Sequence, residues 1–177
     1  MKKLKVNAFT LVELLIVIVI IAILATLVTV SVVGASKKSR DDKRIGDANT
    51  IAIALDQYST ENQRRYPVPS NGTCATTAGT DTYCFVVIPN RSLTTLLAGI
   101  LNPIPTDPLT QTGYQYVYVY KTKGTGAGSR AAVVIDKLER NTSCNISSSN
   151  QSSLPEPVSK YYSMVSAAQT PCYYVAR

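Results

Sequence analysis

The feature that most constrains this chain is an uncharged apolar run near its start. From Leu14 to Val33, twenty residues carry no formal charge, and Thr26, Thr29 and Ser31 are the polar side chains among them. At about 1.5 Å per residue, a helix of this length is about 30 Å long, which matches the hydrocarbon core of a bilayer. The run therefore predicts a helix that can cross a membrane. Glu13 at its edge needs either a polar boundary or a partner charge.

Three interpretations of this run are open. A secretory signal would be cleaved near the small residues Val33-Gly34-Ala35. The apolar core of such a signal is typically only about 7–15 residues long, however, and carries no glutamate near its start. A signal anchor would hold a globular domain outside the membrane, and Lys2, Lys3 and Lys5 would orient it by the positive-inside tendency. The third interpretation comes from the residues between Ala8 and Glu13.

The helix is expected to continue beyond the apolar run as an amphipathic segment. Apolar residues recur there at steps of three or four: Ile45, Ala48, Ala52, Leu55 and Tyr58. Pro67 and Pro69 forbid further extension. We therefore expect one helix from Phe9 to about Asn62, apolar on all sides in its first half and docked on a head domain in its second half.

The charged residues at the start of the amphipathic segment are interpreted as a solvated helix face. Basic and acidic side chains are mixed there: Lys37, Lys38, Arg40, Asp41, Asp42, Lys43, Arg44 and Asp47. Such mixing favours a solvated face over a nucleic-acid-binding patch, and binding of nucleic acid is left open.

The remainder of the chain predicts a small antiparallel sheet. Strict alternation over residues 114–120 predicts a strand with four tyrosines on one face and Gln115, Val117 and Val119 on the other, which is typical of a half-buried sheet. A glycine-rich turn at Lys123–Ser129 leads to a second strand over residues 131–138, and residues 172–175 predict a third. The fold class is therefore α+β, a long N-terminal helix packed on a small antiparallel β-sheet head domain.

The other parts of the head are predicted to be mostly loops. Residues 70–83 are rich in threonine, glycine and serine and are interpreted as a loop. Residues 93–101 predict one or two turns of helix. The tail from Asn141 onward is rich in serine and asparagine at first and is interpreted as a surface loop.

The cysteines indicate disulfide bonds. Cys74, Cys84, Cys144 and Cys172 all lie in the part of the chain expected outside the membrane. None of them forms a close metal-binding pair such as C-x-x-C, so disulfides in an oxidising compartment are expected. Four cysteines allow three pairings, and the shorter sequence loops favour Cys74 with Cys84 and Cys144 with Cys172.

The composition disfavours an enzyme. The chain has no histidine, so serine, cysteine and lysine side chains lack the usual base that activates them as nucleophiles. Asp107 with Asp81 or Asp136 could join a calcium site, but no loop has the ligand spacing of a calcium-binding loop. We therefore expect no catalytic residue, no metal and no cofactor.

The residues around Ala8 resemble a processing site. Three lysines precede Ala8, and Phe9-Thr10-Leu11-Val12-Glu13 leads into the apolar run. This arrangement resembles the class III leader and N-terminal segment of type IV pilins and their pseudopilin relatives. The resemblance implies that a prepilin peptidase cuts between Ala8 and Phe9 and that the new amino group of Phe9 is methylated. The family usually has glycine where this chain has Ala8, which is nearly as small.

A second segment extends the resemblance. Pro105-Thr106-Asp107-Pro108, followed by Gly113, Tyr114 and Tyr116, resembles the P-x-D-P…G-Y-x-Y segment of many small pilins and type II secretion pseudopilins. Together with the helix and strand patterns, it divides the chain into four expected parts: a leader peptide at 1–8, a hydrophobic transmembrane and filament-core helix at 9–34, an amphipathic helix at 35–65, and an extracellular head at 66–177.

The resemblance implies a structural subunit of a type IV pilus. Before assembly it would lie in the inner (cytoplasmic) membrane, and afterwards in the extracellular filament, a helical homopolymer in which Glu13 pairs with the Phe9 amine of a neighbouring copy. Other implied partners are the prepilin peptidase, an inner-membrane platform protein and an assembly ATPase. The filament would serve adhesion, twitching motility or DNA uptake. Alternatives are a pseudopilin of a type II secretion or competence system, and a membrane-anchored monomeric binding domain.

Overall fold

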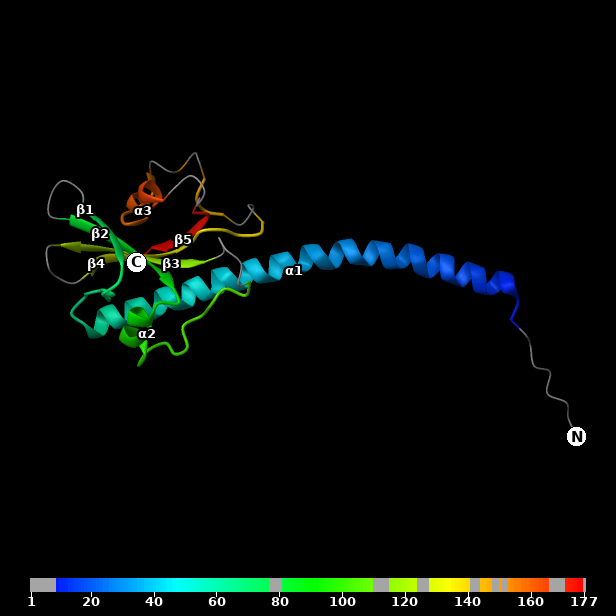
Figure 1. Cartoon of the computed structure of the whole chain (residues 1–177), viewed down its shortest axis with the longest axis horizontal. Coiled ribbons are helices and arrows are strands. Elements are labelled where there is room, and N and C mark those ends of the chain that lie inside the picture. The colour runs from blue at the N-terminus through cyan, green and yellow to red at the C-terminus, as the bar shows by residue number, and fades with distance from the viewer. Residues whose placement is uncertain are drawn as a thin grey trace, which may run out of the picture. The chain divides into compact units, whose positions relative to one another are not determined.

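The computed structural model describes residues 9–76, 81–109, 115–123, 128–140, 144–147, 150, 153–165 and 171–176, without the side chains at 27–31, 76, 123, 128 and 129. The chain divides into two compact units, Met1–Lys38 and Ser39–Arg177, and we call the second unit the head. Helix α1 (Leu11–Glu61) contributes to both units (Figure 1). The predicted α+β fold class is confirmed, because a long N-terminal helix is followed by a small antiparallel sheet.

In the first unit, α1 exposes apolar side chains on every side. Each large apolar residue from Leu11 to Leu24 has between 46% and 79% of its surface exposed. A helix with this surface requires either an apolar partner or an apolar solvent to cover it. Within the residues described above, no helix combines the length and apolarity needed to cross a membrane. The transmembrane helix expected at residues 9–34 stays a prediction.

The head is built on a five-stranded antiparallel sheet whose strands lie side by side in sequence order. The strands are β1 (Thr73–Thr76), β2 (Asp81–Ile88), β3 (Tyr116–Lys123), β4 (Gly128–Ile135) and β5 (Tyr173–Ala176). The three predicted strands correspond to β3, β4 and β5. Gly113, Tyr114 and most of the predicted turn, residues 124–127, lie outside the described residues.

Two predicted loops were wrong. Part of the segment 70–83 forms β1 and the start of β2, which pair so that Cys74 lies directly opposite Cys84. The strand is short and polar, so it has no alternating pattern of its own. The tail contains helix α3 (Val158–Met164), in which Val158 and Tyr161 are buried. Pro157 stands at the N-cap of this helix, where a missing N–H group removes no helical hydrogen bond.

Different elements cover the two faces of the sheet (Figure 1). Helices α1 and α2 (Arg91–Leu97) pack on the face that carries Tyr116, Tyr118 and Tyr120. Helix α3 packs on the opposite face, which carries Val117 and Val119. All five of these β3 side chains are almost fully buried. The tyrosines and valines lie on opposite faces, as predicted. The prediction that only one face of the sheet is buried was wrong, because the tail of the chain covers the second face.

The hydroxyl groups explain why this face of β3 carries tyrosine rather than phenylalanine. The hydroxyl of Tyr116 donates to Asp47 Oδ2 at 2.9 Å. Tyr118 donates to the carbonyl of Pro67 at 2.8 Å, and Tyr120 to the carbonyl of Pro69 at 3.3 Å. These two carbonyls belong to the segment after α1, outside the strands, so the tyrosines supply donors that buried carbonyls require.

Helix α1 ends before the prolines that were expected to stop it. Gln63 and Arg64 have φ values of 58° and 62°, in the left-handed region. The backbone N–H of Arg64 donates to the carbonyl of Ser59 at 2.7 Å, which is the long hydrogen bond of a Schellman cap. Local capping therefore ends the helix at Glu61.

Two disulfides join the same cysteine pairs that the sequence favours. Cys74 bonds to Cys84 across β1 and β2, with a sequence separation of 10, and Cys144 bonds to Cys172 with a separation of 28. The second bond closes the excursion that contains α3. The backbone N–H of Ile146 also donates to the carbonyl of Cys172 at 3.0 Å, so the base of the excursion is held by a hydrogen bond as well.

Removing the Tyr118 hydroxyl should destabilise the head. In the Tyr118→Phe variant, the buried carbonyl of Pro67 loses its donor, and we expect a loss of about 1–2 kcal/mol in the free energy of unfolding. The matched Tyr120→Phe variant loses a longer hydrogen bond and should lose less. Urea unfolding of the full chain in detergent measures both values, and equal losses would contradict this assignment.

Candidate functional site

The first turn of α1 places Glu13 in a capping box with Thr10. The carboxylate oxygen Oε2 accepts from the Thr10 backbone N–H at 2.9 Å and from the Thr10 hydroxyl at 2.7 Å. The Glu13 backbone N–H donates back to the Thr10 hydroxyl at 3.2 Å. This reciprocal pattern satisfies donors at the start of the helix and fixes the direction of the carboxylate. Both hydrogen bonds from Thr10 go to Oε2, and the other carboxylate oxygen, Oε1, takes part in neither of them.

Glu13 is chemically isolated on the first unit. Between Phe9 and Ser36 it is the one residue with a formal charge. Phe9 lies just before α1 with 81% of its surface exposed. A carboxylate amid apolar side chains is stable in water, but it requires a cation once another apolar surface covers the helix.

The predicted site residues do not converge on one place. Phe9 and Glu13 lie in the first unit, whereas the four cysteines lie in the head. Ala8, the residue expected before the cleavage point, lies outside the described residues, as does the rest of the leader.

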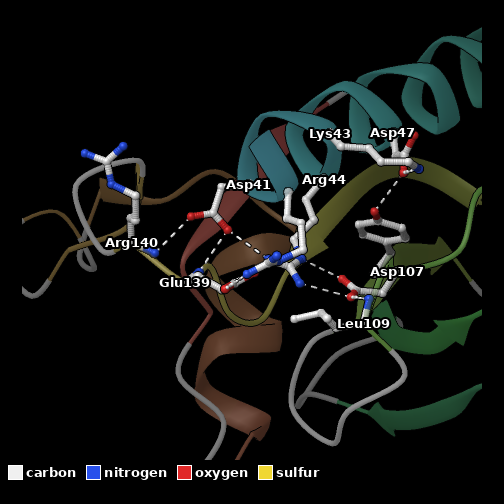
Figure 2. A network of polar contacts seen from close by, with 10 residues as sticks. Asp41, Lys43, Arg44, Asp47, Asp107, Leu109, Glu139 and Arg140 are labelled. Atoms are coloured by element: carbon white, nitrogen blue, oxygen red, sulfur yellow. Dashed lines mark hydrogen bonds and ion pairs between the residues drawn. The ribbon is translucent and has the colours of Figure 1, made fainter. Parts of the chain in front are cut away.

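The head contains a buried group of ion pairs that we call the Arg44 cluster (Figure 2). Its members are Arg40, Asp41, Arg44, Asp107 and Glu139. The side chain of Arg44 has no exposed surface, and Asp41 has 1%. Charges this deeply buried are tolerated only when they are paired and hydrogen-bonded.

Arg44 reaches three carboxylates. Its Nε and Nη2 donate to the two oxygens of Asp107 at 2.7 and 3.1 Å, which is a bidentate pair. Its Nη1 donates to Asp41 Oδ1 at 2.8 Å and to Glu139 Oε1 at 3.1 Å. Burial by itself would lower the pKa of Arg44, but the hydrogen bonds to Asp107 and Glu139 raise this pKa above its ordinary value.

The other members fasten loops of the head to α1. Arg40 donates through Nε and Nη2 to both oxygens of Glu139, each at 2.6 Å. The Asp41 carboxylate accepts the backbone N–H groups of Glu139 and Arg140, each at 2.9 Å. Asp107 Oδ1 also accepts the N–H of Leu109 at 2.7 Å. Two loops, one before β3 and one after β4, are thus attached to a single stretch of helix (Figure 2).

The solvated helix face predicted for this segment was wrong at Asp41 and Arg44. Mixed charge in the sequence cannot distinguish an exposed pair from a buried one, because the partners Asp107 and Glu139 are distant along the chain. The Pro105-Thr106-Asp107-Pro108 motif was the available signal, since it drew attention to Asp107. Nothing in the sequence pattern pointed to Glu139.

The aspartates considered for calcium have separate partners. Asp107 binds Arg44, Asp81 binds Lys121 Nζ at 2.8 Å, and the buried Asp136 accepts from Gln115 at 2.6 Å and from the Tyr161 hydroxyl at 2.9 Å. No group of three potential metal ligands occurs in the described part of the chain.

Comparison with known proteins identifies one family feature. Residues 3–29 match the prokaryotic N-terminal methylation motif. No curated protein and no solved structure matches the chain.

Acid should weaken the head through Glu139. Hydrogen bonds from Arg40, together with those from Arg44, lower the pKa of Glu139 from 4.5 to about 2. Its contribution to stability is therefore present above about pH 4.5 and is lost as the pH falls toward 2. We expect the unfolding temperature of the full chain, followed by circular dichroism, to fall over this range.

Two variants separate this contribution from others. Glu139→Gln should be less stable at pH 7 and should show a shallower acid decline, since it has lost the titrating group. Burial raises the pKa of Asp136, so the folded state binds that proton more tightly and Asp136 opposes the decline. Asp136→Asn should therefore steepen the fall of the unfolding temperature with decreasing pH. An acid decline of equal slope in Glu139→Gln and the unmodified chain would contradict the assignment.

Proposed function

We propose that this chain, whose residues 3–29 carry the N-terminal methylation motif of type IV pilins and pseudopilins, is a structural subunit of a type IV pilus filament. The observation that carries the proposal is the motif itself, followed by an apolar helix with one charged residue. No catalytic function is proposed.

Maturation begins with hydrolysis of the Ala8–Phe9 peptide bond by the prepilin peptidase. The cut creates an amino terminus at Phe9, and methylation of this amine keeps it a base that is protonated near neutral pH. The capping box supports the role of Glu13, because it holds this carboxylate in the first helical turn by hydrogen bonds from the residue that follows Phe9.

Assembly rests on packing between copies of the apolar helix. The exposed residues from Leu11 to Leu24 would be covered by the same residues of neighbouring subunits. In that environment, Oε1 of Glu13 accepts the protonated Phe9 amine of another copy. An unpaired carboxylate in an apolar medium costs several kcal/mol, so the pairing fixes the axial register of the subunits.

The same motif supports a set of partners and locations. The subunit would reside in the inner membrane before assembly and in the extracellular filament afterwards, with a platform protein and an assembly ATPase driving the transfer. The filament would serve adhesion, twitching motility or DNA uptake. The two disulfides of the head are consistent with an oxidising compartment.

A pseudopilin of a type II secretion or competence system is the second candidate. The motif at residues 3–29 is common to both groups. The Pro105–Pro108 segment, whose Asp107 binds Arg44 of α1, resembles a segment of both small pilins and type II secretion pseudopilins, so it agrees with either candidate. Long surface filaments would favour the pilin, and short periplasmic ones the pseudopilin.

The mature amino terminus tests the processing step. We expect mass spectrometry of the chain from its native host to find methylated Phe9 as the first residue, since the motif directs cleavage after Ala8. A start at Ser36 would indicate ordinary secretion, and an intact Met1 would indicate a simple membrane anchor. Either result would overturn the proposal.

Substitution of Glu13 tests the assembly step. Glu13→Gln removes the charge with little change in shape, and we expect filaments seen by electron microscopy to decrease roughly 10-fold or more. The head should stay folded, as judged by its unfolding temperature. Glu61→Gln is the matched control, because Glu61 is an exposed glutamate at the other end of α1. Normal filaments from Glu13→Gln would contradict the proposed pairing of Glu13 with Phe9, whereas a membrane-anchored monomer would form no filaments with either residue.

A further inference from the structure

The part of α1 that belongs to the head is held in two different ways. From Ala48 onward it is held by apolar packing: Ala48, Ile51, Ala52 and Leu55 have no exposed surface. In the preceding nine residues, Ser39–Asp47, the buried side chains are Asp41 and Arg44, both charged. The change from buried charged residues to buried apolar residues occurs between Arg44 and Ala48, about one helical turn.

Polar contacts attach Ser39–Asp47 to the rest of the head. Arg40, Asp41 and Arg44 bind the loops that carry Asp107 and Glu139, and Asp47 accepts the Tyr116 hydroxyl. Ile45 supplies an apolar contact with the core and is only partly buried. A Cβ atom at Gly46 would have no atom within 4 Å, so the backbone there is not packed against a neighbour.

This arrangement makes the attachment of the segment all-or-none. The ion pairs share Arg44 and Glu139, so the loss of one charge leaves its buried partners uncompensated. The apolar packing of the helix from Ala48 onward involves none of these charged side chains. The helix beyond that point can therefore stay docked after the ionic contacts have separated.

We propose that Ser39–Asp47 is a release segment, which detaches from the head and unwinds when the Arg44 cluster opens, while Ala48–Glu61 and the sheet stay folded. Its nine residues span about 13.5 Å as helix at about 1.5 Å per residue, and roughly 30 Å when extended at about 3.3 Å per residue. Its use rests on the proposed function: in a filament under tension, unwinding of the released segment would lengthen each subunit without unfolding the rest of its head.

Hydrogen exchange of the full chain, dispersed in detergent, tests the release segment. Asp107→Asn keeps the shape of the side chain and an oxygen for the Leu109 N–H but removes the charge that faces Arg44. We expect the amides of residues 43–47 to exchange on the order of 100-fold faster than in the unmodified chain. The amides of residues 51–58 and of β3 should exchange at unchanged rates.

A control and a second variant complete the test. Lys43→Met removes an exposed ion pair with Asp47 on the same helix and should leave all rates within about twofold. Arg40→Gln removes a half-exposed member of the cluster and provides the measurement if Asp107→Asn fails to fold. Faster exchange of the segment together with the core, or no change in either variant, would overturn the proposal. Because the chain is dispersed, the result does not depend on whether filaments form.

Discussion

The attachment of α1 to the head depends on the burial of one guanidinium group. Arg44 has no exposed surface, and its charge is tolerated because Asp41, Asp107 and Glu139 surround it with hydrogen bonds. These carboxylates come from the helix itself and from two loops that are more than 60 residues away in sequence. Folding of the head must bring all three segments together, because any incomplete arrangement leaves a buried charge without a partner. The cluster thus selects one position of the helix on the sheet, which apolar packing of small residues such as Ala48 and Ala52 specifies less strictly.

Much of the architecture could be predicted from local patterns. The apolar periodicity of α1 and the alternation around Tyr116–Tyr120 identified the long helix and its sheet, since both patterns arise from residues close in sequence. Elements whose stability comes from distant partners were not predicted. Strand β1 depends on its pairing with β2, and α3 depends on the apolar face of β3 and β4 that Val158 and Tyr161 cover. The Arg44 cluster is the same kind of case, because charge pairing across the fold leaves no periodic signal.

The two units differ in whether their polar and apolar groups find partners within the same chain. In the head, tyrosine hydroxyls and carboxylates satisfy buried polar groups within a single chain, and two disulfides cross-link that chain. In the first unit, the large apolar side chains from Leu11 to Leu24 remain exposed, and Thr10 hydrogen-bonds only one of the two carboxylate oxygens of Glu13. A chain with one self-sufficient part and one unsatisfied part is suited to association through the latter.

The order of the strands has a consequence for how the head is made. Every strand pairs with the strand that precedes it along the chain, from β1 to β5, and all pairs are antiparallel. A ribosome or translocation pore that delivers the chain from its amino end presents each strand to an edge that already exists. The sheet can therefore form one strand at a time, starting before the carboxyl end of the chain has arrived. The Cys144–Cys172 disulfide is then the last to form, because Cys172 directly precedes the final strand, β5.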